Sequence, residues 1–427
     1  MKVKLLFLFL AAFIIRLIAL NQSLWLDEAI TANVIKNYSY VHLVTQFSIN
    51  DFHPPLHYEL LKLWSSFFGT SEIALRFPSL FASLITGYFV FLIGKKLKNQ
   101  AVGASAAALY LFNPLIVYYS QEARMYSLVT LFLTISFYCF LQKKSLFFNI
   151  FSSLALFTHY GAIFYLITIF LYLLFKKRYQ IILTMVPGTI ITLIVLSPLI
   201  IHQFLYATRA LVNVTNWSLV LGKADLKNLI LIPLKFVTGR ISFYPKIAYF
   251  TISVTAALIT FFVAFSSSSK LLKFIFITPL IFAFIISFNS PMFQYFRYLY
   301  LIPILSLLIA SNNSHHFLKR FIFIIFLGFS LLYLSNQDYY REDWKSLSSA
   351  LPANATVYMI PSFGDPIKYY RPDVNIVDIK KPPVSGSITV IPYGLSIYGL
   401  NQQQLLTGYQ HLATLPYRQL TLELWQK

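Results

Sequence analysis

Long apolar runs separated by short polar or basic segments fill the first three quarters of the chain. A membrane-spanning helix needs about 20 predominantly apolar residues, and the runs predict eleven such helices. We expect them at residues 4–20, 78–96, 101–119, 125–141, 146–160, 161–175, 180–200, 247–265, 273–289, 297–311 and 320–335. No small-residue cleavage site follows the first run, so we interpret it as a retained span rather than a signal peptide.

Basic residues predict the orientation of these helices. They gather in alternate loops: Lys2/Lys4, Lys95/Lys96/Lys98, Lys143/Lys144, Lys176/Lys177/Arg178, Lys270/Lys273 and Lys319/Arg320. All of these loops fall on one side if the amino terminus is cytoplasmic, as the positive-inside rule requires. The outer side then receives residues 21–77, 120–124, 201–246 and 290–296, and the tail from residue 336. This arrangement places the protein in a cell (plasma or inner) membrane.

The pattern changes after residue 335. YYREDWKSLSSALP predicts an amphipathic helix, ATVYMIP and ITVIPYG predict strands, and LNQQQLLTGYQHLATL predicts another helix. The expected architecture is therefore an all-α polytopic membrane domain at residues 1–335, followed by a small extracytoplasmic α/β domain at residues 336–427.

Composition supports the membrane assignment and argues against a soluble protein and a nucleic-acid-binding protein. The 427 residues are 58% hydrophobic and only 11% charged, against about 25% charged in soluble domains, and the mean hydropathy is +0.67. The net charge of +20 does not indicate a nucleic-acid partner, because the basic residues lie in short clusters between apolar runs. The single cysteine, Cys139, excludes an intramolecular disulfide and is expected to be a packed thiol.

Two adjacent carboxylates, Asp27 and Glu28, lie at the outer end of the first span in the sequence SLWLDEAIT. Carboxylates so close to the membrane are costly unless they are used or neutralised. They could serve as the cap and first-turn acid of a helix EAITANVIKN, or they could act on a substrate. From these residues alone the two interpretations are equally open.

Further polar groups belong to the same outer face. Pro54 and Pro55 predict the start of a helix that lies flat on the membrane, with Leu56, Leu60, Leu63, Trp64 and Phe67 on its apolar face and His53, His57 and Glu59 near its polar edge. The short turn between the third and fourth spans carries Gln121, Glu122, Arg124 and Tyr126. Arg297 lies at the outer mouth of the tenth span, and Arg16 lies inside the first.

Structural roles compete for these residues too. Glu122 and Arg124 could form an ion pair with each other, and Arg297 or Arg16 could extend toward the membrane surface. His159, in FTHYG, is expected to be a hydrogen-bonded residue at a helix end. Their combination on one face nevertheless suits catalysis. A carboxylate can take a proton from a hydroxyl nucleophile, and arginines can hold a phosphate. A phosphate-linked sugar on a polyprenyl chain is a natural ligand at this depth.

The order LWLDEA, HPPLHYELLKLW, ALRFPS, YYSQEARMYSL, THY and RYLYLIP resembles the GT-C superfamily of glycosyltransferases. The most similar branch is that of the protein O-mannosyltransferases and aminoarabinose lipid A transferases, described as dolichyl-phosphate-mannose-protein mannosyltransferase-like. The resemblance is strongest over residues 1–180. It implies a GT-C fold and an inverting transfer of mannose, or a related hexose or pentose, from a polyprenyl-phosphate donor outside the membrane.

The resemblance also implies roles for individual residues. Asp27 matches the acid of the first outer loop and would be the general base, with Glu28 beside it. Arg124 and Arg297 would bind phosphate, Glu122 would contact the acceptor or a metal, and His53 and Tyr126 would help bind substrate. Whether a divalent metal takes part is left open, with His53 and Glu122 as candidate ligands. The acceptor is a glycolipid, a glycan or a protein.

The loop at 201–246 is too short for the β-trefoil domain of the eukaryotic O-mannosyltransferases, which weakens the case for a protein acceptor of their kind. Two other function classes make different predictions. A transporter or flippase of lipid-linked saccharides predicts ionisable residues in the middle of several spans, whereas here Arg16 is the main one. A membrane scaffold would place the function in the tail.

Overall fold

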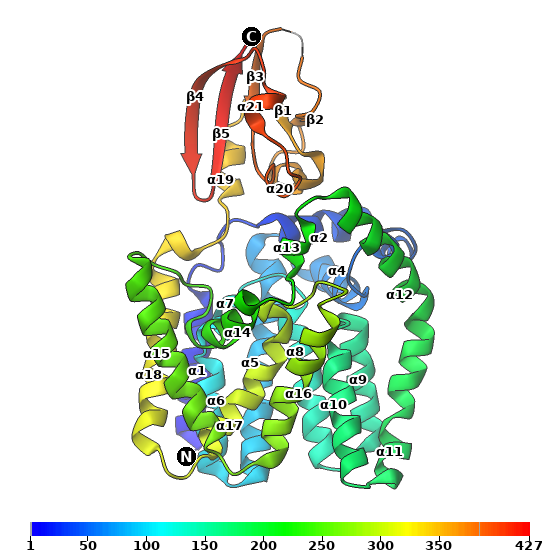
Figure 1. The fold of residues 1–427 in the computed structure, drawn as a ribbon, viewed down its shortest axis with the longest axis vertical. Helices are drawn as coiled ribbons and strands as arrows, with labels where there is room; N and C mark the ends of the chain where they lie inside the picture. Colours follow the sequence, from blue (N-terminus) through cyan, green and yellow to red (C-terminus); the bar gives the residue numbers. More distant parts are fainter. Residues whose placement is uncertain (1, 384) are drawn as a thin grey trace.

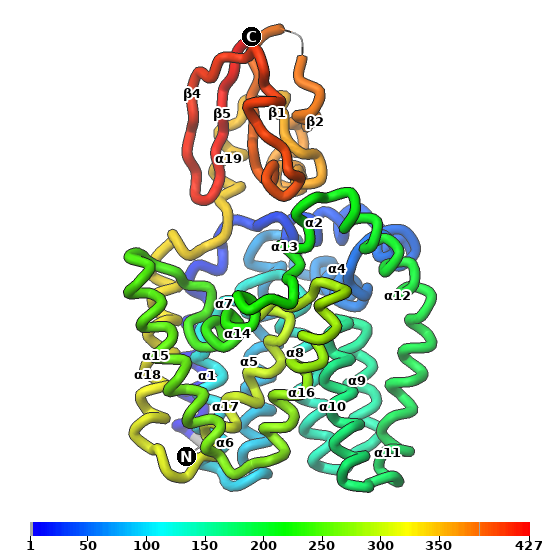
Figure 2. The backbone as a smooth tube through the Cα atoms, viewed as in Figure 1, coloured from blue at the N-terminus to red at the C-terminus, as the bar shows by residue number. Residues whose placement is uncertain are grey.

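The computed structural model describes residues 2–383 and 385–427, which form a bundle of helices with a small β-sheet unit on one end (Figure 1). The amino terminus lies at the end of the bundle opposite the sheet unit, and the carboxyl terminus lies at the far tip of that unit (Figure 2). The loops predicted to be cytoplasmic lie at the amino-terminal end of the bundle.

Each predicted span corresponds to helix in the bundle. The helices are α1 (Lys2–Leu17), α5 (Glu72–Leu97), α6 (Gln100–Leu111), α7 (Pro114–Tyr119), α8 (Tyr126–Leu141), α9 (Ser145–Thr158), α10 (Ala162–Phe175), α11 (Tyr179–Met185), α12 (Pro187–Asn213), α15 (Lys246–Phe265), α16 (Lys270–Ile286), η3 (Tyr295–Leu301), α17 (Ile302–Ser311) and α18 (His316–Ser335). Within the described residues, α5, α12, α15 and α18 are long and apolar enough to cross a membrane on their own. The predicted span 101–119 is broken between α6 and α7, where the Asn113 side chain caps α7 and Pro114 begins it.

Shorter helices lie on the outer end of the bundle, toward the sheet unit. They are α2 (Leu26–Asn37), α3 (Tyr40–His42), η1 (Leu43–Phe47), η2 (Ser48–Asn50), α4 (Leu56–Phe68), α13 (Trp217–Leu221), α14 (Leu226–Thr238) and η4 (Gln337–Tyr339). The helix predicted after Pro55 is α4. It leaves Leu60, Leu63 and Phe67 exposed, as expected of a helix whose apolar face rests on a membrane surface.

The sheet unit consists of α19 (Trp344–Ser349), β1 (Thr356–Met359), η5 (Pro361–Phe363), α20 (Asp365–Tyr370), β2 (Asn375–Asp378), β3 (Ser387–Val390), α21 (Gln402–Leu405), β4 (Gln410–Tyr417) and β5 (Leu420–Gln426). The strand order is β2-β1-β3-β5-β4. Strand β1 runs parallel to β2 and β3, with Val357 opposite both Ile376 and Thr389. Strand β5 runs antiparallel to β3 and β4.

The helix predicted over LNQQQLLTGYQHLATL is wrong beyond Leu405. Residues from Gln410 instead form β4, which pairs with β5 across a tight turn at Arg418 and Gln419, where Gln419 has a φ of 59°. The pairing partner lies outside the predicted segment, so the local apolar spacing favoured helix where long-range strand pairing prevails. The helix predicted from Tyr339 is also shorter than expected, because α19 begins at Trp344.

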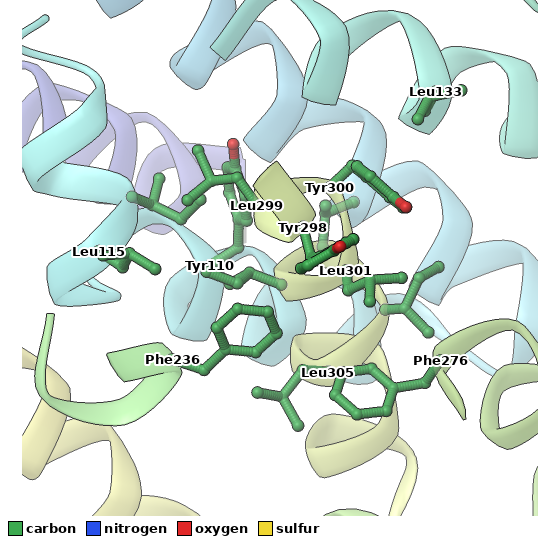
Figure 3. Close-up of a cluster of buried hydrophobic side chains, with 14 of the residues drawn as sticks. Tyr110, Leu115, Leu133, Phe236, Phe276, Tyr298, Leu299, Tyr300, Leu301 and Leu305 are labelled. Carbon is green, nitrogen blue, oxygen red and sulfur yellow. The ribbon is translucent and has the colours of Figure 1, made fainter. Parts of the chain in front are cut away.

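The bundle core is centred on the segment that leads from η3 into α17. Tyr298, Leu299, Tyr300, Leu301 and Leu305 are buried there, and Figure 3 shows Phe236 and Phe276 among the side chains around them. Cys139 is a free, buried thiol, as predicted.

Arg16 is fully buried inside the bundle and does not extend to the membrane surface. Its guanidinium donates to the Ser83 hydroxyl at 3.1 Å and to the carbonyls of Ala12 and Leu111 at 2.8 Å. It therefore ties α1 to α5 and α6.

Candidate functional site

Glu28 and Arg76 form a closed ion pair beneath the outer surface. Glu28 lies in the first turn of α2, and Arg76 lies one turn into α5. The Arg76 Nε donates to Oε1 at 2.9 Å, and Nη2 donates to Oε2 at 2.6 Å. Neither side chain is more than 1% exposed. The pair has the side-on, two-bond geometry that makes Arg–carboxylate contacts specific.

The remaining donors of Arg76 hold the chain that connects α1 to α2. They bind the carbonyls of Leu20, Gln22 and Ser23 at 2.9, 2.6 and 3.0 Å. Glu28 in turn accepts the backbone N–H of Ala123 at 2.7 Å. The pair thus joins α2, α5 and the turn between α7 and α8, and it fixes where the first turn of α2 lies.

Asp27 precedes Glu28 in that turn but faces the other way, with a third of its side chain exposed. Its Oδ2 lies 3.4 Å from Arg124 Nη2. Arg124 Nη1 also donates to the Asp27 carbonyl at 3.4 Å and to the Thr31 hydroxyl at 3.3 Å. Burial alone would lower the pKa of Arg124, but the combined effect of Asp27, Tyr58, Tyr126 and Asp51 outweighs it and the pKa is raised. Both side chains are held in place, yet one edge of Asp27 stays open.

The capping interpretation of the acidic pair is partly wrong. Asp27 and Glu28 do occupy the first turn of α2, but the N-cap residue is Trp25, and no side chain caps this helix. Glu28 is occupied by Arg76 and Ala123, which leaves Asp27 as the accessible carboxylate of the two.

A second group of polar side chains lies before and within α4. The Tyr58 hydroxyl donates to Asp51 Oδ2 at 2.7 Å, and the same carboxylate oxygen lies 3.6 Å from His53 Nδ1. His57 is buried, with Nε2 3.3 Å from the Ala123 carbonyl, so its predicted place on the polar edge of the helix is wrong. Burial, reinforced by the charge of Arg124, lowers the pKa of His57 to about 3.

A cavity of about 410 Å³ opens beside this group. Its polar end carries His53, His159 and Arg297. The Arg297 Nε is buried and has no hydrogen-bond partner in residues 2–383 and 385–427. Burial lowers the pKa of His53, and the positive charges of Arg124 and Arg297 lower it further against the opposing effect of the Asp51 carboxylate. The His159 Nδ1 accepts the Gly161 N–H at 3.0 Å, as expected of a helix-end histidine.

Most of the remaining cavity wall is apolar. It is built from α10, α12 and the end of α16, and its side chains include Ile163, Phe164, Ile200, Phe204, Leu211 and Ile286. The Tyr126 ring, at the start of α8, lies 5.9 Å from that of His159. The cavity therefore joins an apolar channel to a cationic end.

Glu122 is bound by a residue from the sheet unit's connecting segment. Arg341 Nε and Nη2 donate to Glu122 Oε1 at 3.0 and 2.9 Å, and the Arg341 guanidinium stacks 3.6 Å from the Trp25 ring. The predicted alternative of a Glu122–Arg124 ion pair is therefore wrong. The second oxygen, Oε2, is buried and accepts no hydrogen bond within the described residues.

Arg240, from the loop after α14, approaches the same cluster. It donates to the Tyr118 hydroxyl at 2.9 Å and lies 5.1 Å from that ring, while the Arg341 guanidinium lies 5.7 Å from the same ring. Tyr118 thus lies between two cations that come from distant parts of the chain.

Sequence reasoning missed Arg76, Arg240, Arg341 and Asp51 as site residues. Arg76 stands in the quoted motif ALRFPS, and its charge next to an apolar run was a usable signal. Arg341 lies within the segment predicted as an amphipathic helix, whereas the structure places it in the irregular segment before α19. No local signal marks Arg240.

The sequence left open whether a divalent metal binds, so we looked for side chains that could hold one in the part of the chain that the structure describes. Among the described residues, no three His, Cys, Asp or Glu side chains form a group that could hold a metal ion. The candidate ligands are directed elsewhere, His53 toward Asp51 and Glu122 toward Arg341.

The family resemblance is confirmed by comparison with known proteins. Residues 52–202 match the sequence model of a family described as dolichyl-phosphate-mannose-protein mannosyltransferase. The matched segment runs from just before α4 to the middle of α12, and so includes Glu122, Arg124 and Tyr126. No curated protein sequence matches the chain.

The fold is that of the GT-C glycosyltransferases. The crystal structure of ArnT from Cupriavidus metallidurans in the apo state aligns over 99% of this chain and 98% of its own, with a TM-score of 0.59 and 11% identity. The same protein bound to undecaprenyl phosphate aligns over 99% and 97%, with a TM-score of 0.58 and 10% identity. The archaeal oligosaccharyltransferase AglB from Archaeoglobus fulgidus, in complex with an inhibitory peptide and a dolichol-phosphate, covers 96% of this chain and 73% of its own, with a TM-score of 0.54 and 11% identity.

Proposed function

We propose that this chain is an integral membrane glycosyltransferase that moves a sugar from a polyprenyl-phosphate donor to an acceptor hydroxyl on the outer face of a cell membrane. One arrangement carries the proposal. The partly exposed carboxylate of Asp27 is held by Arg124, and Arg297 lies with His53 and His159 in the wall of a mostly apolar cavity.

The cavity suits a ligand that is apolar along its length and anionic at one end. A polyprenyl chain would lie along α10, α12 and α16, and its phosphate would reach Arg297. The buried, unpartnered Nε of Arg297 is a donor that such a phosphate would satisfy. The structures of ArnT with undecaprenyl phosphate and of AglB with a dolichol-phosphate support a donor of this class.

Asp27 is our candidate for the general base. In a single displacement the acceptor hydroxyl gives its proton to Asp27, and its oxygen bonds to the anomeric carbon as the bond from that carbon to the phosphate oxygen breaks. The configuration inverts because no covalent enzyme intermediate forms. The leaving phosphate takes the electron pair, and its growing charge is stabilised by Arg297 and Arg124. Glu28 has no free edge, so we assign it the role of positioning Asp27 rather than that of a second catalytic acid.

Other residues of the outer face would complete the site. His53 and Tyr126 would contact the donor near its phosphate, and Glu122, held by Arg341, would contact the acceptor. The sugar is mannose or a related hexose or pentose, and the acceptor is a glycolipid, a glycan or a protein. The amino terminus would be cytoplasmic and the sheet unit extracytoplasmic.

The proposal is tested by sugar transfer from a labelled polyprenyl-phosphate mannose with the full-length protein in nanodiscs. Membrane lipid extract and a hydroxyl-bearing glycan serve as acceptors. We expect turnover by the wild type, and loss of at least 100-fold with Asp27→Asn while the donor still binds. Asp378→Asn removes one carboxylate from the sheet unit, far from the cavity, and should retain full activity.

Three other outcomes would contradict the proposal in different ways. Equal turnover by Asp27→Asn and wild type would remove Asp27 from the chemical step. Donor binding without transfer in nanodiscs, together with movement of intact donor across the bilayer of sealed proteoliposomes, would favour the transporter. Absence of donor binding by a folded wild type would leave the acidic pair with a purely structural role.

A further inference from the structure

We propose that the amino-terminal end of the bundle carries a binding site for an anionic phospholipid, separate from the donor cavity. The site is a cavity of about 580 Å³ between α6 and α18, at the end of the bundle far from the sheet unit. The inference does not depend on the proposed transferase activity.

The mouth of this cavity is cationic. Lys98, Lys319 and Arg320 line it, together with His316 and the side chains of Asn99, Asn312 and Asn313. Lys98 Nζ donates to the Ser311 carbonyl at 3.1 Å and to Asn313 Oδ1, and Lys319 Nζ donates to the Asn312 carbonyl at 2.8 Å. The two ammonium groups therefore converge on three consecutive residues, and the partners they have there are neutral.

No carboxylate of the sequence is available to balance these charges. All 14 acidic residues lie at positions 27–72, at 122, at 225, and from 338 onward. The acid at the start of α5, Glu72, is separated from Lys98 by a helix of 26 residues, which is about 39 Å long at 1.5 Å per residue. Neighbouring cations without a counter-charge repel each other, so an anion bound between them would be stabilised.

The turn that contacts the lysines is joined to the bundle by hydrogen bonds. Asn312 is buried and donates to the Val263 carbonyl of α15 at 2.9 Å. Its Oδ1 accepts the backbone N–H groups of Ser314 and His315 at 2.8 and 3.2 Å. The Asn312 side chain therefore holds the turn whose carbonyls accept hydrogen bonds from Lys98 and Lys319.

The interior of the cavity selects a lipid over a free anion. Behind the mouth, α6 presents small residues at Ala101, Ser105 and Ala108, and α18 faces them with Phe323 and Ile324. The spacing of the small residues places them on one helix face, which leaves a groove running toward the bilayer midplane. Ile324 is 61% exposed. A phosphate at the lysines would continue into an acyl chain along this groove, as described for basic pockets between membrane helices.

The test measures lipid retention by native mass spectrometry of the full-length protein in a neutral detergent. Phosphatidylglycerol and phosphatidylcholine with the same acyl chains are added in equal amounts. We expect the wild type to retain phosphatidylglycerol preferentially. The double variant Lys98→Gln/Lys319→Gln should bind it about 30-fold more weakly. Lys143→Gln/Lys144→Gln makes the same charge change at the same end of the bundle outside the cavity, and should bind as the wild type does.

A second variant separates the lipid from a free anion. Ala108→Phe fills the apolar part of the groove and keeps every charge, so it should reduce phosphatidylglycerol retention. Inorganic phosphate added to the wild type as a competitor should leave phosphatidylglycerol retention unchanged. If inorganic phosphate displaces the lipid and Ala108→Phe has no effect, the site binds free anions and the proposal is overturned. Equal retention by wild type and the double lysine variant would also overturn it.

Cross-linking of a photoreactive phosphatidylglycerol to the wild type locates the bound lipid without the use of a variant. Its cross-links should map to peptides containing residues 98–109 and 312–324. Cross-links spread evenly around the bundle surface would contradict a defined site.

Discussion

The carboxylate of Glu28 faces the guanidinium of Arg76 side-on, with Oε1 2.9 Å from Nε and Oε2 2.6 Å from Nη2, and the two side chains are almost completely buried. The residues are 48 positions apart in sequence. Their pairing turns one member of the acidic doublet into a structural anchor and leaves Asp27, its neighbour, facing Arg124.

Removing one partner of this pair should destabilise the outer end of the bundle. In Arg76→Gln the Glu28 carboxylate stays buried without its counter-charge, and breaking a buried pair in this way costs about 3–5 kcal/mol. We expect a clear fall in the thermal unfolding midpoint, measured by size-exclusion chromatography after heating in detergent. Lys345→Gln breaks the Lys345–Glu72 pair, whose lysine is 53% exposed, and should change the midpoint little. Equal midpoints for the two variants would show that the buried pair is not the anchor.

The membrane part of the fold could be predicted because its signal is local. The length of an apolar run sets the length of a helix, so ranges such as 125–141 and 247–265 agree closely with α8 and α15. The strand β4 could not be predicted in the same way. Its residues pair with β5 across a turn, and the apolar spacing of QQLLTGYQHLATL is compatible with helix until that pairing forms.

The candidate site likewise contains residues that a local signal reveals and residues that only the tertiary structure reveals. Asp27, Arg124 and Arg297 could be proposed because a charge beside an apolar run is conspicuous in the sequence. Their partners could not, because the pairings depend on tertiary structure. Glu122, for example, binds Arg341, which is 219 residues away, and not the arginine two positions along the chain.

The Glu122–Arg341 contact predicts that the segment before the sheet unit supports catalysis. Arg341→Ala would release Glu122 and the stacking on Trp25, shifting one wall of the site. A misplacement of about 1 Å is enough to lower a rate by about 100-fold, so we expect kcat to fall by 10- to 100-fold. Arg341→Lys should recover only part of that loss, because an ammonium cannot make both bonds to the carboxylate. Transfer kinetics with labelled donor would measure this, and a folded Arg341→Ala with wild-type kcat would show that the segment is peripheral.

The buried His57 predicts a loss of stability in mild acid. Its pKa is lowered to about 3 in the folded protein, first by burial and then by Arg124, against about 6.5 in the unfolded chain. Between pH 6.5 and pH 3, His57 is therefore protonated in the unfolded chain but neutral in the folded protein. Stability from this group is complete above that pH and falls by about 1.4 kcal/mol per pH unit toward pH 3.

Thermal unfolding at pH 7 and pH 5 would measure this effect. His57→Gln keeps a donor for the Ala123 carbonyl but does not titrate, so its midpoint should fall less between the two pH values than that of the wild type. His411→Gln, in exposed β4, should behave as the wild type does. If His57→Gln shows the full wild-type fall, other groups account for the acid sensitivity.

Arg297 predicts how the donor phosphate is held. Its buried Nε has no partner among the described residues, and a charge-assisted hydrogen bond to phosphate contributes about 1.5–3 kcal/mol, which corresponds to about 10- to 100-fold in affinity. Arg297→Gln should therefore weaken binding of a polyprenyl monophosphate by that factor and lower transfer as well, because the same group stabilises the leaving phosphate.

Arg209→Gln is the control, because it makes the same substitution at an exposed arginine of α12. This variant should bind the polyprenyl monophosphate as the wild type does. Binding measured by tryptophan fluorescence or by competition with labelled donor would separate the two variants. If Arg297→Gln bound the lipid phosphate as tightly as Arg209→Gln, the phosphate would have to lie elsewhere, and the cluster around Arg341 and Arg240 would be the next place to test.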